Sequence, residues 1–226
     1  MPLLSVVIPA FNEAGTIRQL IEKVNAVGLD KEVVVIDNGS TDGTDKILRQ
    51  INLPNLKVVH HLVNRGKGGG VLTGIAHAEG EFVVIQDADL EYDPNDFLKL
   101  MEAIRTANAD LALGCRFTKG YHGLFLHRMG NKFLTRLLNR LFGAKFNDYA
   151  TCYKLARTDV FRNLGLKANG FEIEIEILCN ALKKKLKIVE VPVSYHPRSY
   201  QQGKKIRWID GLWAVFYIIK YRFLGG

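Results

Sequence analysis

Two apolar runs rich in β-branched residues most constrain how this chain can fold. The runs Val33-Val34-Val35-Ile36 and Val83-Val84-Ile85 are apolar on both faces. Such strands lie in parallel sheets covered by helices on both sides, because a strand with one face in solvent alternates between apolar and polar residues. The sequence therefore predicts an α/β fold with a buried, parallel sheet at its centre.

Helix-like segments alternate with strand-like runs in the first half of the chain. We expect strands at 3–8, 32–36, 57–60, 81–86 and 111–114, and helices at 13–27, 42–50, 71–78 and 94–106. This alternation is typical of a Rossmann-like, doubly wound, mostly parallel sheet with helices on both faces. The carboxyl ends of its strands share one edge, where ligands of open α/β sheets bind.

The pattern changes after Arg116. We expect, in order, a basic helix at 127–142, a strand at 151–155, a helix at 172–184, a strand at 186–193, a polar loop at 196–205 and a last helix from 206. No linker rich in proline or serine interrupts the 226 residues. We therefore predict a single domain with two halves, 1–115 and 116–226.

The charge and the cysteine content restrict the partners and the compartment. The formal net charge is +8, and much of the excess lies in the second half, which favours an anionic partner. Nucleic acid is not expected, because no nucleic-acid-binding motif is evident. Three cysteines without paired spacing indicate a reducing compartment, and no leader or bilayer-spanning run is evident. The expected location is the cytoplasm.

Three acidic residues, Asp87, Asp89 and Glu91, follow the strand-like run at 81–86. If the chain stays extended past Ile85, their carboxylates lie on one side. Such hard oxygen ligands suit Mg²⁺ or Mn²⁺, which bind few protein carboxylates and complete their shell with water and substrate phosphates. This motif predicts a metal-bound diphosphate. The alternative is that an Asp-x-Asp pair only caps the strand and solubilises a turn.

Polar clusters also follow the first two strands, at 9–13 and 37–43. Asp37 is placed to accept hydrogen bonds from a nucleobase or ribose, and Phe11 to pack against the base. The alternative is ordinary turn chemistry for 38–40 and a core position for Phe11. With the acidic motif, these clusters make 1–115 the expected nucleotide-binding half and 116–226 the acceptor-side half.

A glycine-rich segment at 64–70 precedes a predicted helix and contains two cations, Arg65 and Lys67. Its composition is typical of a loop whose backbone N–H groups surround a phosphate. Lys67 is therefore a candidate donor-binding residue. The segment matches neither the Walker A nor the GxGxxG pattern, and the alternative is a flexible glycine turn.

In this order, the motifs resemble those of the inverting glycosyltransferases of the GT-A fold. Among these, the chain is similar to the polyprenyl-phosphate hexose synthases typified by dolichyl-phosphate mannose and glucose synthases. Phe11 and Asn38 depart from the Tyr and the second acid that this family often has. The resemblance runs along nearly the whole chain, through 5–13, 37–44, 64–70, 86–94, 114–116, Arg128, 170–172 and 198–205.

The resemblance implies roles for individual residues. Around the base and ribose it places Pro9, Phe11, Glu13 and Asp37. It implies that Asp87, Asp89 and Glu91 hold the metal. It also implies that Arg198, with Lys204 nearby, is the cation of a mobile loop that closes over the donor. Arg116 and Arg128 match positions that hold the acceptor phosphate. The implied donor is a UDP- or GDP-hexose, the acceptor a polyprenyl phosphate and the cofactor Mg²⁺ or Mn²⁺.

The acceptor chemistry leaves alternatives. A lipid monophosphate needs no general base, because its second pKa of about 6 leaves it largely dianionic at neutral pH. A hydroxyl acceptor needs a base, for which Glu174 or Glu176 is the candidate. Lys204 replaces the Gln of the Gln-x-x-Arg-Trp motif of processive relatives, which disfavours that class. An inert scaffold and a nucleotide-sugar pyrophosphorylase are weaker alternatives.

The last helix, from Ile206 to Phe223, is apolar at helical spacing and basic at its ends. Such a helix can lie in the plane of a membrane surface without crossing the bilayer. We therefore expect a peripheral protein on the cytoplasmic face of a membrane, with a membrane-anchoring partner subunit as an option. The alternative is that the same apolar stripe packs on the sheet as core.

Overall fold

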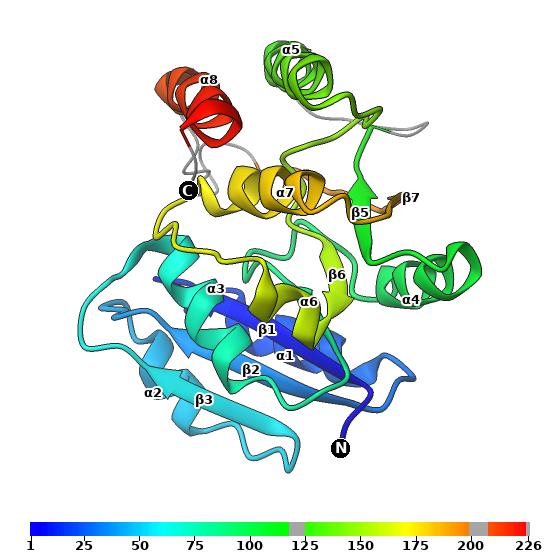
Figure 1. Cartoon of the computed structure of the whole chain (residues 1–226). Coiled ribbons are helices and arrows are strands. Elements are labelled where there is room, and N and C mark those ends of the chain that lie inside the picture. The colour runs from blue at the N-terminus through cyan, green and yellow to red at the C-terminus, as the bar shows by residue number, and fades with distance from the viewer. Residues whose placement is uncertain (118–124, 199–207, 225–226) are drawn as a thin grey trace.

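The computed structural model describes residues 1–117, 125–198 and 208–224, except for the side chains of 125–127 and 208–210. Seven strands form one sheet (Figure 1). They are β1 (Leu4–Ala10), β2 (Lys31–Asp37), β3 (Leu56–His60), β4 (Phe82–Ile85), β5 (Leu111–Cys115), β6 (Lys154–Arg157) and β7 (Ile188–Pro192).

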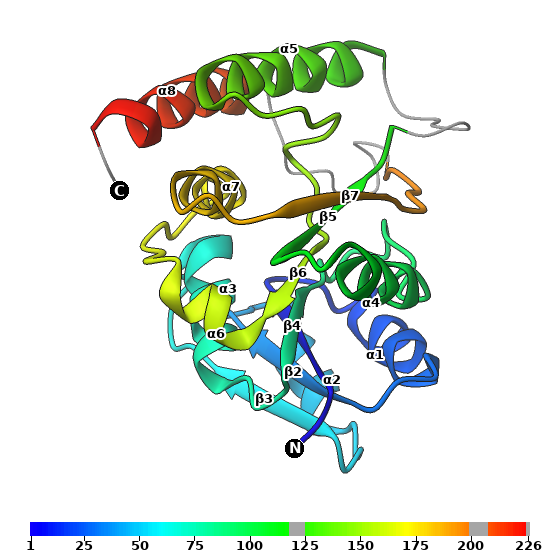
Figure 2. The same cartoon turned by 45° about the vertical axis from the view of Figure 1, so that its right-hand side comes forward.

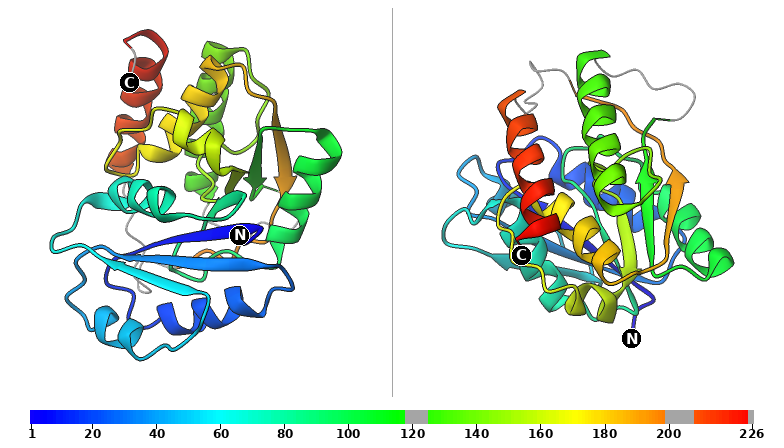
Figure 3. Two further views of the ribbon diagram at one scale, coloured as in Figure 1. Left: turned by 60° about the horizontal axis from the view of Figure 1, so that its bottom comes forward. Right: turned by 45° about the horizontal axis from the view of Figure 1, so that its top comes forward.

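Eight helices surround the sheet in the described parts of the chain. They are α1 (Ile17–Ala26), α2 (Thr44–Arg49), α3 (Gly66–His77), α4 (Asp96–Ala107), α5 (Phe125–Phe142), α6 (Thr158–Asn163), α7 (Ile173–Lys183) and α8 (Trp208–Phe223). Helices α1 and α2 cover one face of the first strands, and α3 covers the other (Figure 3). Helices α5 and α8 lie side by side beyond α7 (Figure 2).

The strand order is β3-β2-β1-β4-β6-β5-β7. Strand β6 is antiparallel to both neighbours, and every other pair is parallel. The Rossmann-like, mostly parallel sheet predicted from the sequence is therefore confirmed. Because β1, β2 and β4 run in the same direction, the segments that follow them meet at one edge, and this edge carries the candidate site.

The apolar runs form the centre of the core as predicted. Every residue of β2 and of β4 is buried. Helix α3 approaches β1 closely, because a Cβ on Gly74 would lie 2.2 Å from Val7 Cγ1 and one on Gly70 would lie 2.9 Å from Pro9 Cβ. The glycines of α3 therefore bring this helix against the strand.

Three predictions about local structure were wrong. Residues 66–70 are the first turns of α3 rather than a loop. The strand expected at 151–155 lies at Lys154–Arg157, and the short helix α6 that follows it was not predicted. Beyond Ile85 the chain does not stay extended but forms a turn, in which Leu90 has a φ of 62°.

Candidate active site

Asp87 and Asp89 lie directly after β4, in the turn at the carboxyl edge of the sheet. The buried Gln86 side chain donates from Nε2 to the Asp87 carbonyl at 2.8 Å, and Tyr153 donates its hydroxyl to Gln86 Oε1 at 2.7 Å. Asp89 Oδ1 accepts the Glu91 N–H at 3.1 Å. The buried side chains of Gln86 and Tyr153 therefore fix the backbone that carries both aspartates.

Glu91 turns toward the second half of the chain. Its carboxylate accepts the Tyr195 hydroxyl at 2.6 Å and the Arg198 N–H at 2.8 Å, and its backbone carbonyl accepts the His196 N–H at 2.7 Å. The left-handed Leu90 separates Glu91 from Asp89, so the expected alternation along an extended chain does not apply. In this structure Glu91 holds the segment 195–198 over the aspartates.

Arg198 bridges acidic residues from two strand ends. Its Nη2 lies 3.1 Å from Asp89 Oδ2 and its Nη1 lies 3.4 Å from Glu13 Oε2. Burial lowers the pKa of the guanidinium, but the carboxylates of Asp89 and Glu13 outweigh this effect and raise it. The structure thus brings together Glu13, Asp89 and Arg198, three of the predicted site residues. Lys204, the second predicted cation of this loop, lies outside the described residues.

The two aspartates carry negative charge that the surrounding protein only partly compensates. Burial, and then the neighbouring Asp87 and Glu91 carboxylates, raise the pKa of Asp89 to about 7 against the opposing effect of Arg198. Within residues 1–117, 125–198 and 208–224, no three His, Cys, Asp or Glu side chains are gathered as a metal site. A cation held by Asp87 and Asp89 together with substrate oxygens fits this donor set, because Mg²⁺ and Mn²⁺ bind few protein carboxylates.

The segments after β1 and β2 are tied together beside Glu13. The Asn12 N–H donates to Ser40 Oγ at 3.0 Å, and Asn12 Oδ1 accepts the Thr41 N–H at 2.8 Å. Asp37 is buried and accepts the Ser40 N–H at 3.2 Å, and its Oδ2 lies 3.0 Å from His60 Nδ1. Pro9 and Phe11, which flank this junction, are partly exposed. His60, which the sequence analysis did not single out, thus contacts a candidate site residue.

Asn38 organises the region where we expected a phosphate loop. Its Oδ1 accepts from His61 Nδ1 at 2.8 Å and from the Arg65 N–H at 3.0 Å, while its Nδ2 donates to the Gly66 carbonyl at 2.9 Å. An ionised carboxylate accepts hydrogen bonds but cannot donate one. The acid that the family often has at the position of Asn38 would therefore lose the hydrogen bond to the Gly66 carbonyl.

The predicted phosphate-binding loop at 64–70 is corrected by the structure. The N–H groups of Gly68 and Gly69 donate to the Gly170 and Asn169 carbonyls, each at 3.1 Å. A Cβ on Gly68 would lie 2.1 Å from the Ala168 carbonyl oxygen. The start of α3 is therefore packed against the segment before α7 and does not present these two N–H groups to a phosphate.

Lys67 also lies in a different setting from the one expected. Its Nζ lies 2.7 Å from Asp87 Oδ1 and 2.8 Å from Glu174 Oε1. Glu174 Oε2 contacts Lys154 Nζ, and Lys154 is completely buried. Burial by itself raises the pKa of Glu174, but the Lys154 and Lys67 ammonium groups outweigh it and hold that pKa below its usual value.

Glu174 and Glu176, the candidate general bases, are both buried and engaged. Glu174 is bound between two lysines, and Glu176 Oε2 accepts the N–H groups of Lys167 and Ala168, each at 2.9 Å. Both carboxylates are therefore already paired within the protein.

Arg116 and the start of α5 meet at the buried Asp148. Arg116 donates from Nε to Asp148 Oδ2 at 2.7 Å and from Nη2 to Oδ1 at 2.8 Å, and Asn131 Nδ2 donates to Oδ1 at 3.2 Å. The Arg116 guanidinium also lies 5.1 Å from the centre of the Tyr195 ring. The partly buried Arg128 precedes Asn131 by one turn of α5. The two predicted acceptor arginines thus lie on elements that are consecutive in the chain: Arg116 directly follows β5, and Arg128 lies in α5.

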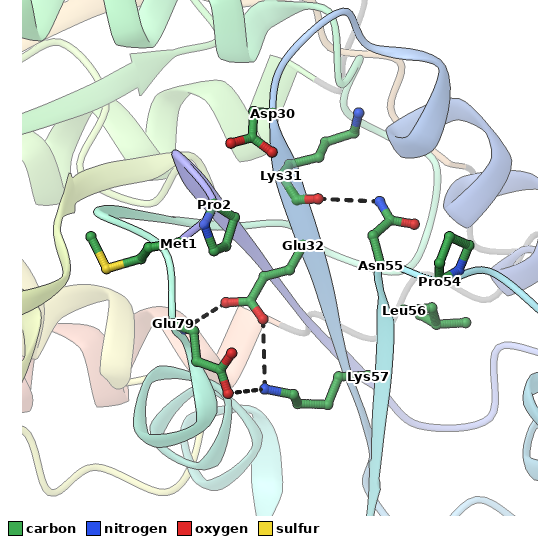
Figure 4. Close-up of a pocket in the computed structure, with 10 residues that line it drawn as sticks. All are labelled: Met1, Pro2, Asp30, Lys31, Glu32, Pro54, Asn55, Leu56, Lys57 and Glu79. Carbon is green, nitrogen blue, oxygen red and sulfur yellow. Dashed lines mark hydrogen bonds and ion pairs between the residues drawn. The ribbon is translucent and has the colours of Figure 1, made fainter.

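A hollow of about 420 Å³ lies away from this site, at the opposite edge of the sheet, near the amino ends of β2 and β3 (Figure 4). Its charged groups pair with one another, since Lys57 Nζ lies 2.7 Å from Glu79 Oε1 and 3.6 Å from Glu32 Oε2. This hollow is separate from the acidic strand ends.

Only part of the apolar surface of α8 packs into the core. Ala214, Ile218 and Tyr221 face inward and are buried, whereas a second row on the same helix is exposed. The exposed row, which we call the aromatic face of α8, consists of Leu212, Trp213, Phe216, Ile219 and Phe223. Trp208 and Ile209 also belong to the apolar stripe expected between Ile206 and Phe223, but their side chains are outside the described set. No helix in the described parts of the chain combines the length and hydropathy needed to cross a bilayer.

Comparisons with known proteins identify relatives across most of the chain. The model of the family described as glycosyl transferase family 2 matches residues 5–165. The low-salt glycan biosynthesis hexosyltransferase Agl6 of Haloferax volcanii is 32% identical over 204 residues, which are 87% of this chain and 48% of that protein. A dolichol-phosphate mannosyltransferase of Pyrococcus furiosus is 30% identical over 210 residues, covering 89% of this chain and 58% of that protein. The chain thus spans about half the length of these two curated relatives.

A solved structure supports the fold assignment. Glucosyl-3-phosphoglycerate synthase from Mycobacterium tuberculosis, in complex with Mn²⁺, UDP and glucosyl-3-phosphoglycerate, superposes with a TM-score of 0.74. It is 23% identical, and the match covers 98% of this chain and 80% of that one. At this identity the likeness carries the fold and not the substrates.

Proposed function

The chain belongs to glycosyl transferase family 2, and from this premise we propose that it transfers a hexose from a UDP- or GDP-hexose to a polyprenyl monophosphate with inversion. One observation carries the proposal: Asp87 and Asp89 lie at the carboxyl end of β4, and Arg198 forms an ion pair with Asp89. The dolichol-phosphate mannosyltransferase among the relatives supports the lipid acceptor.

On the donor side, Asp87 and Asp89 are the two carboxylates that would hold Mg²⁺ or Mn²⁺. The cation, when bound, stabilises the negative charge that grows on the leaving diphosphate. Arg198 would add a second positive charge there, since it already lies between Asp89 and Glu13. Pro9, Phe11, Glu13 and Asp37 would surround the base and ribose.

On the acceptor side, an oxygen of the lipid phosphate attacks the anomeric carbon of the hexose. The bond from that carbon to the diphosphate oxygen breaks, and the nucleoside diphosphate leaves with the electron pair. The dianionic acceptor brings its own nucleophile, which agrees with the engagement of Glu174 and Glu176. Arg116 and Arg128 would bind the remaining phosphate oxygens through charge-assisted hydrogen bonds.

The aromatic face of α8 supports a peripheral position on a membrane, where the lipid acceptor resides. Trp213 and Phe216 are 54% and 50% exposed, and Lys220 and Arg222 follow at the end of the helix. Exposed aromatic side chains beside cations suit the boundary between headgroups and acyl chains. We place this surface on the cytoplasmic leaflet, and a membrane-anchoring partner subunit is compatible with it.

Acceptor specificity is the decisive test. Labelled UDP- and GDP-hexoses are incubated with Mn²⁺ and with polyprenyl phosphate, free polyprenol, a soluble sugar or phosphoglyceric acid. We expect label in the organic phase only with the phosphorylated lipid and only with one class of donor. Transfer to the soluble sugar alone would replace the proposal by a hydroxyl-acceptor glycosyltransferase, and transfer to phosphoglyceric acid alone by a transferase with a soluble phosphorylated acceptor.

A further inference from the structure

Four side chains of alternating charge run from the core to the acidic strand end. Lys154 Nζ contacts Glu174 Oε2, Glu174 Oε1 lies 2.8 Å from Lys67 Nζ, and Lys67 Nζ lies 2.7 Å from Asp87 Oδ1. Lys154 also donates to the Thr151 carbonyl. The set joins β6, α7, α3 and the segment after β4, and we call it the charge relay.

Stability alone does not account for these buried charges. The side chain of Lys154 is completely buried, and those of Glu174 and Lys67 are 9% and 12% exposed. Replacing buried ion pairs by apolar residues of similar volume is often neutral or stabilising. Of the four relay side chains, that of Asp87 is the most exposed, at 25%, and it lies at the candidate site. The end that reaches the site is therefore the end where a function is expected.

The geometry gives each member a separate task. Lys154 occupies one oxygen of Glu174, so only the other oxygen faces Lys67. Glu174 then shares Lys67 with Asp87. Without Glu174, Lys67 would lose the second carboxylate that fixes its ammonium group beside Asp87, and without Lys154, Glu174 would lose the ammonium group that fixes its own orientation.

We propose that Lys154 and Glu174 are positioning residues, which hold Lys67 against Asp87 and so orient this carboxylate for the metal-bound donor diphosphate. The inference rests on the proposed function, because it takes Asp87 as a donor-side ligand. It adds two residues that do not reach the substrate themselves.

The variants are chosen by the net charge that each of them leaves in the charge relay. Lys154→Met leaves the relay with one excess negative charge, Glu174→Gln leaves one excess positive charge, and the double variant is neutral. The neutral double variant should fold with a melting temperature near that of the parent, since no buried charge is left uncompensated. The matched control is Lys31→Met. Lys31 is a buried lysine at the opposite edge of the sheet (Figure 4), which donates to the Asn25, Val27 and Leu29 carbonyls.

The measurement is calorimetric titration of UDP and of GDP in the presence of Mn²⁺, together with thermal melting and steady-state kinetics on the full chain. The double variant is expected to bind the Mn²⁺–nucleotide pair at least about tenfold more weakly than the parent, the size typical of residues that orient metal ligands. Lys31→Met is expected to melt at a lower temperature and to bind as the parent does.

Three outcomes would overturn the proposal. A double variant that keeps the parental affinity and kcat shows that the relay does not act on the site. A double variant that fails to fold where Lys31→Met folds shows that the relay is structural support. A parent that binds Mn²⁺ with neither nucleotide, and transfers no hexose, contradicts the proposed function and the relay with it.

Discussion

The two halves of the chain contribute unequally to the charge of the candidate site. Its carboxylates, on Glu13, Asp87, Asp89 and Glu91, belong to residues 1–115, whereas Arg198 belongs to residues 116–226. An uncompensated buried charge is strongly destabilising, so the acidic edge needs cations: Lys67 of the first half pairs with Asp87, and Arg198 of the second half pairs with Asp89. The comparison teaches that the first half supplies the carboxylates at the strand ends together with Lys67, whereas the second half adds Arg198, which offsets part of their remaining charge.

The largest effect should follow a change on the acidic side. We predict that Asp89→Asn lowers kcat by about 1,000-fold, because a bound cation contributes several kcal/mol of transition-state stabilisation. Folding should be unchanged, and chelation of the metal by EDTA should reproduce the loss in the parent. The control is Asp159→Asn, at an exposed carboxylate on α6. Equal Mn²⁺-stimulated rates for Asp89→Asn and the parent would remove Asp89 from the site.

A change on the basic side tests the other half of the comparison. Arg198→Ala should lower kcat by about 100-fold and raise the donor KM by less, because a charge aimed at the leaving group acts mainly in the transition state. Steady-state kinetics with varied donor measure both. Arg157→Ala, at an exposed surface pair with Glu81, is the control and should behave as the parent. An unchanged kcat for Arg198→Ala would mean that the arginine only neutralises the free site.

The acceptor side should respond in KM. Arg128→Gln should raise the KM for polyprenyl phosphate by about tenfold, the size expected for one lost charge-assisted hydrogen bond. The donor KM should stay constant. Arg140→Gln, on an exposed position near the other end of α5, provides the comparison. A rise in donor KM instead would move Arg128 to the nucleotide.

The smallest effect is expected on the aromatic face of α8. Phe216→Ser should weaken binding to anionic lipid vesicles about fivefold, or about 1 kcal/mol, because one exposed ring contributes only part of the buried apolar area. Co-sedimentation with vesicles measures it. Leu98→Ser, at an exposed apolar residue of α4, should have no effect. If both variants sediment as the parent does, another surface meets the membrane.

The sequence analysis succeeded where local patterns decide the structure. The apolar runs placed β2 and β4 within a residue or two of their observed bounds, because a strand buried on both faces has a distinctive composition. The acids after β4 and Arg198 were singled out as candidate site residues, because their residue types occur in a recognisable order, and the structure places Arg198 in contact with Asp89 and Glu91. What these residues contact was not predictable from spacing.

The sequence analysis failed where packing between elements that are far apart in the chain decides the structure. Gly68 and Gly70 indicate a loop by propensity, yet they lie in α3, where larger side chains would collide with the Ala168 carbonyl and Pro9. Lys154 begins an otherwise ordinary strand, and nothing nearby in the sequence signals its burial against Glu174. Asp148 and His60 were missed for the same reason.

The antiparallel strand β6 has a consequence for how the chain folds during synthesis. It inserts between β4 and β5, although β5 leaves the ribosome first. Strands β1 to β4 find their partners among themselves as they emerge, whereas the sheet partners of β5 are β6 and β7. A nascent chain that ends before residue 154 therefore carries an apolar strand with two unpaired edges, the kind of segment that associates wrongly with other chains. Leu111–Cys115 is thus the stretch whose protection by chaperones matters most while the second half is still being made.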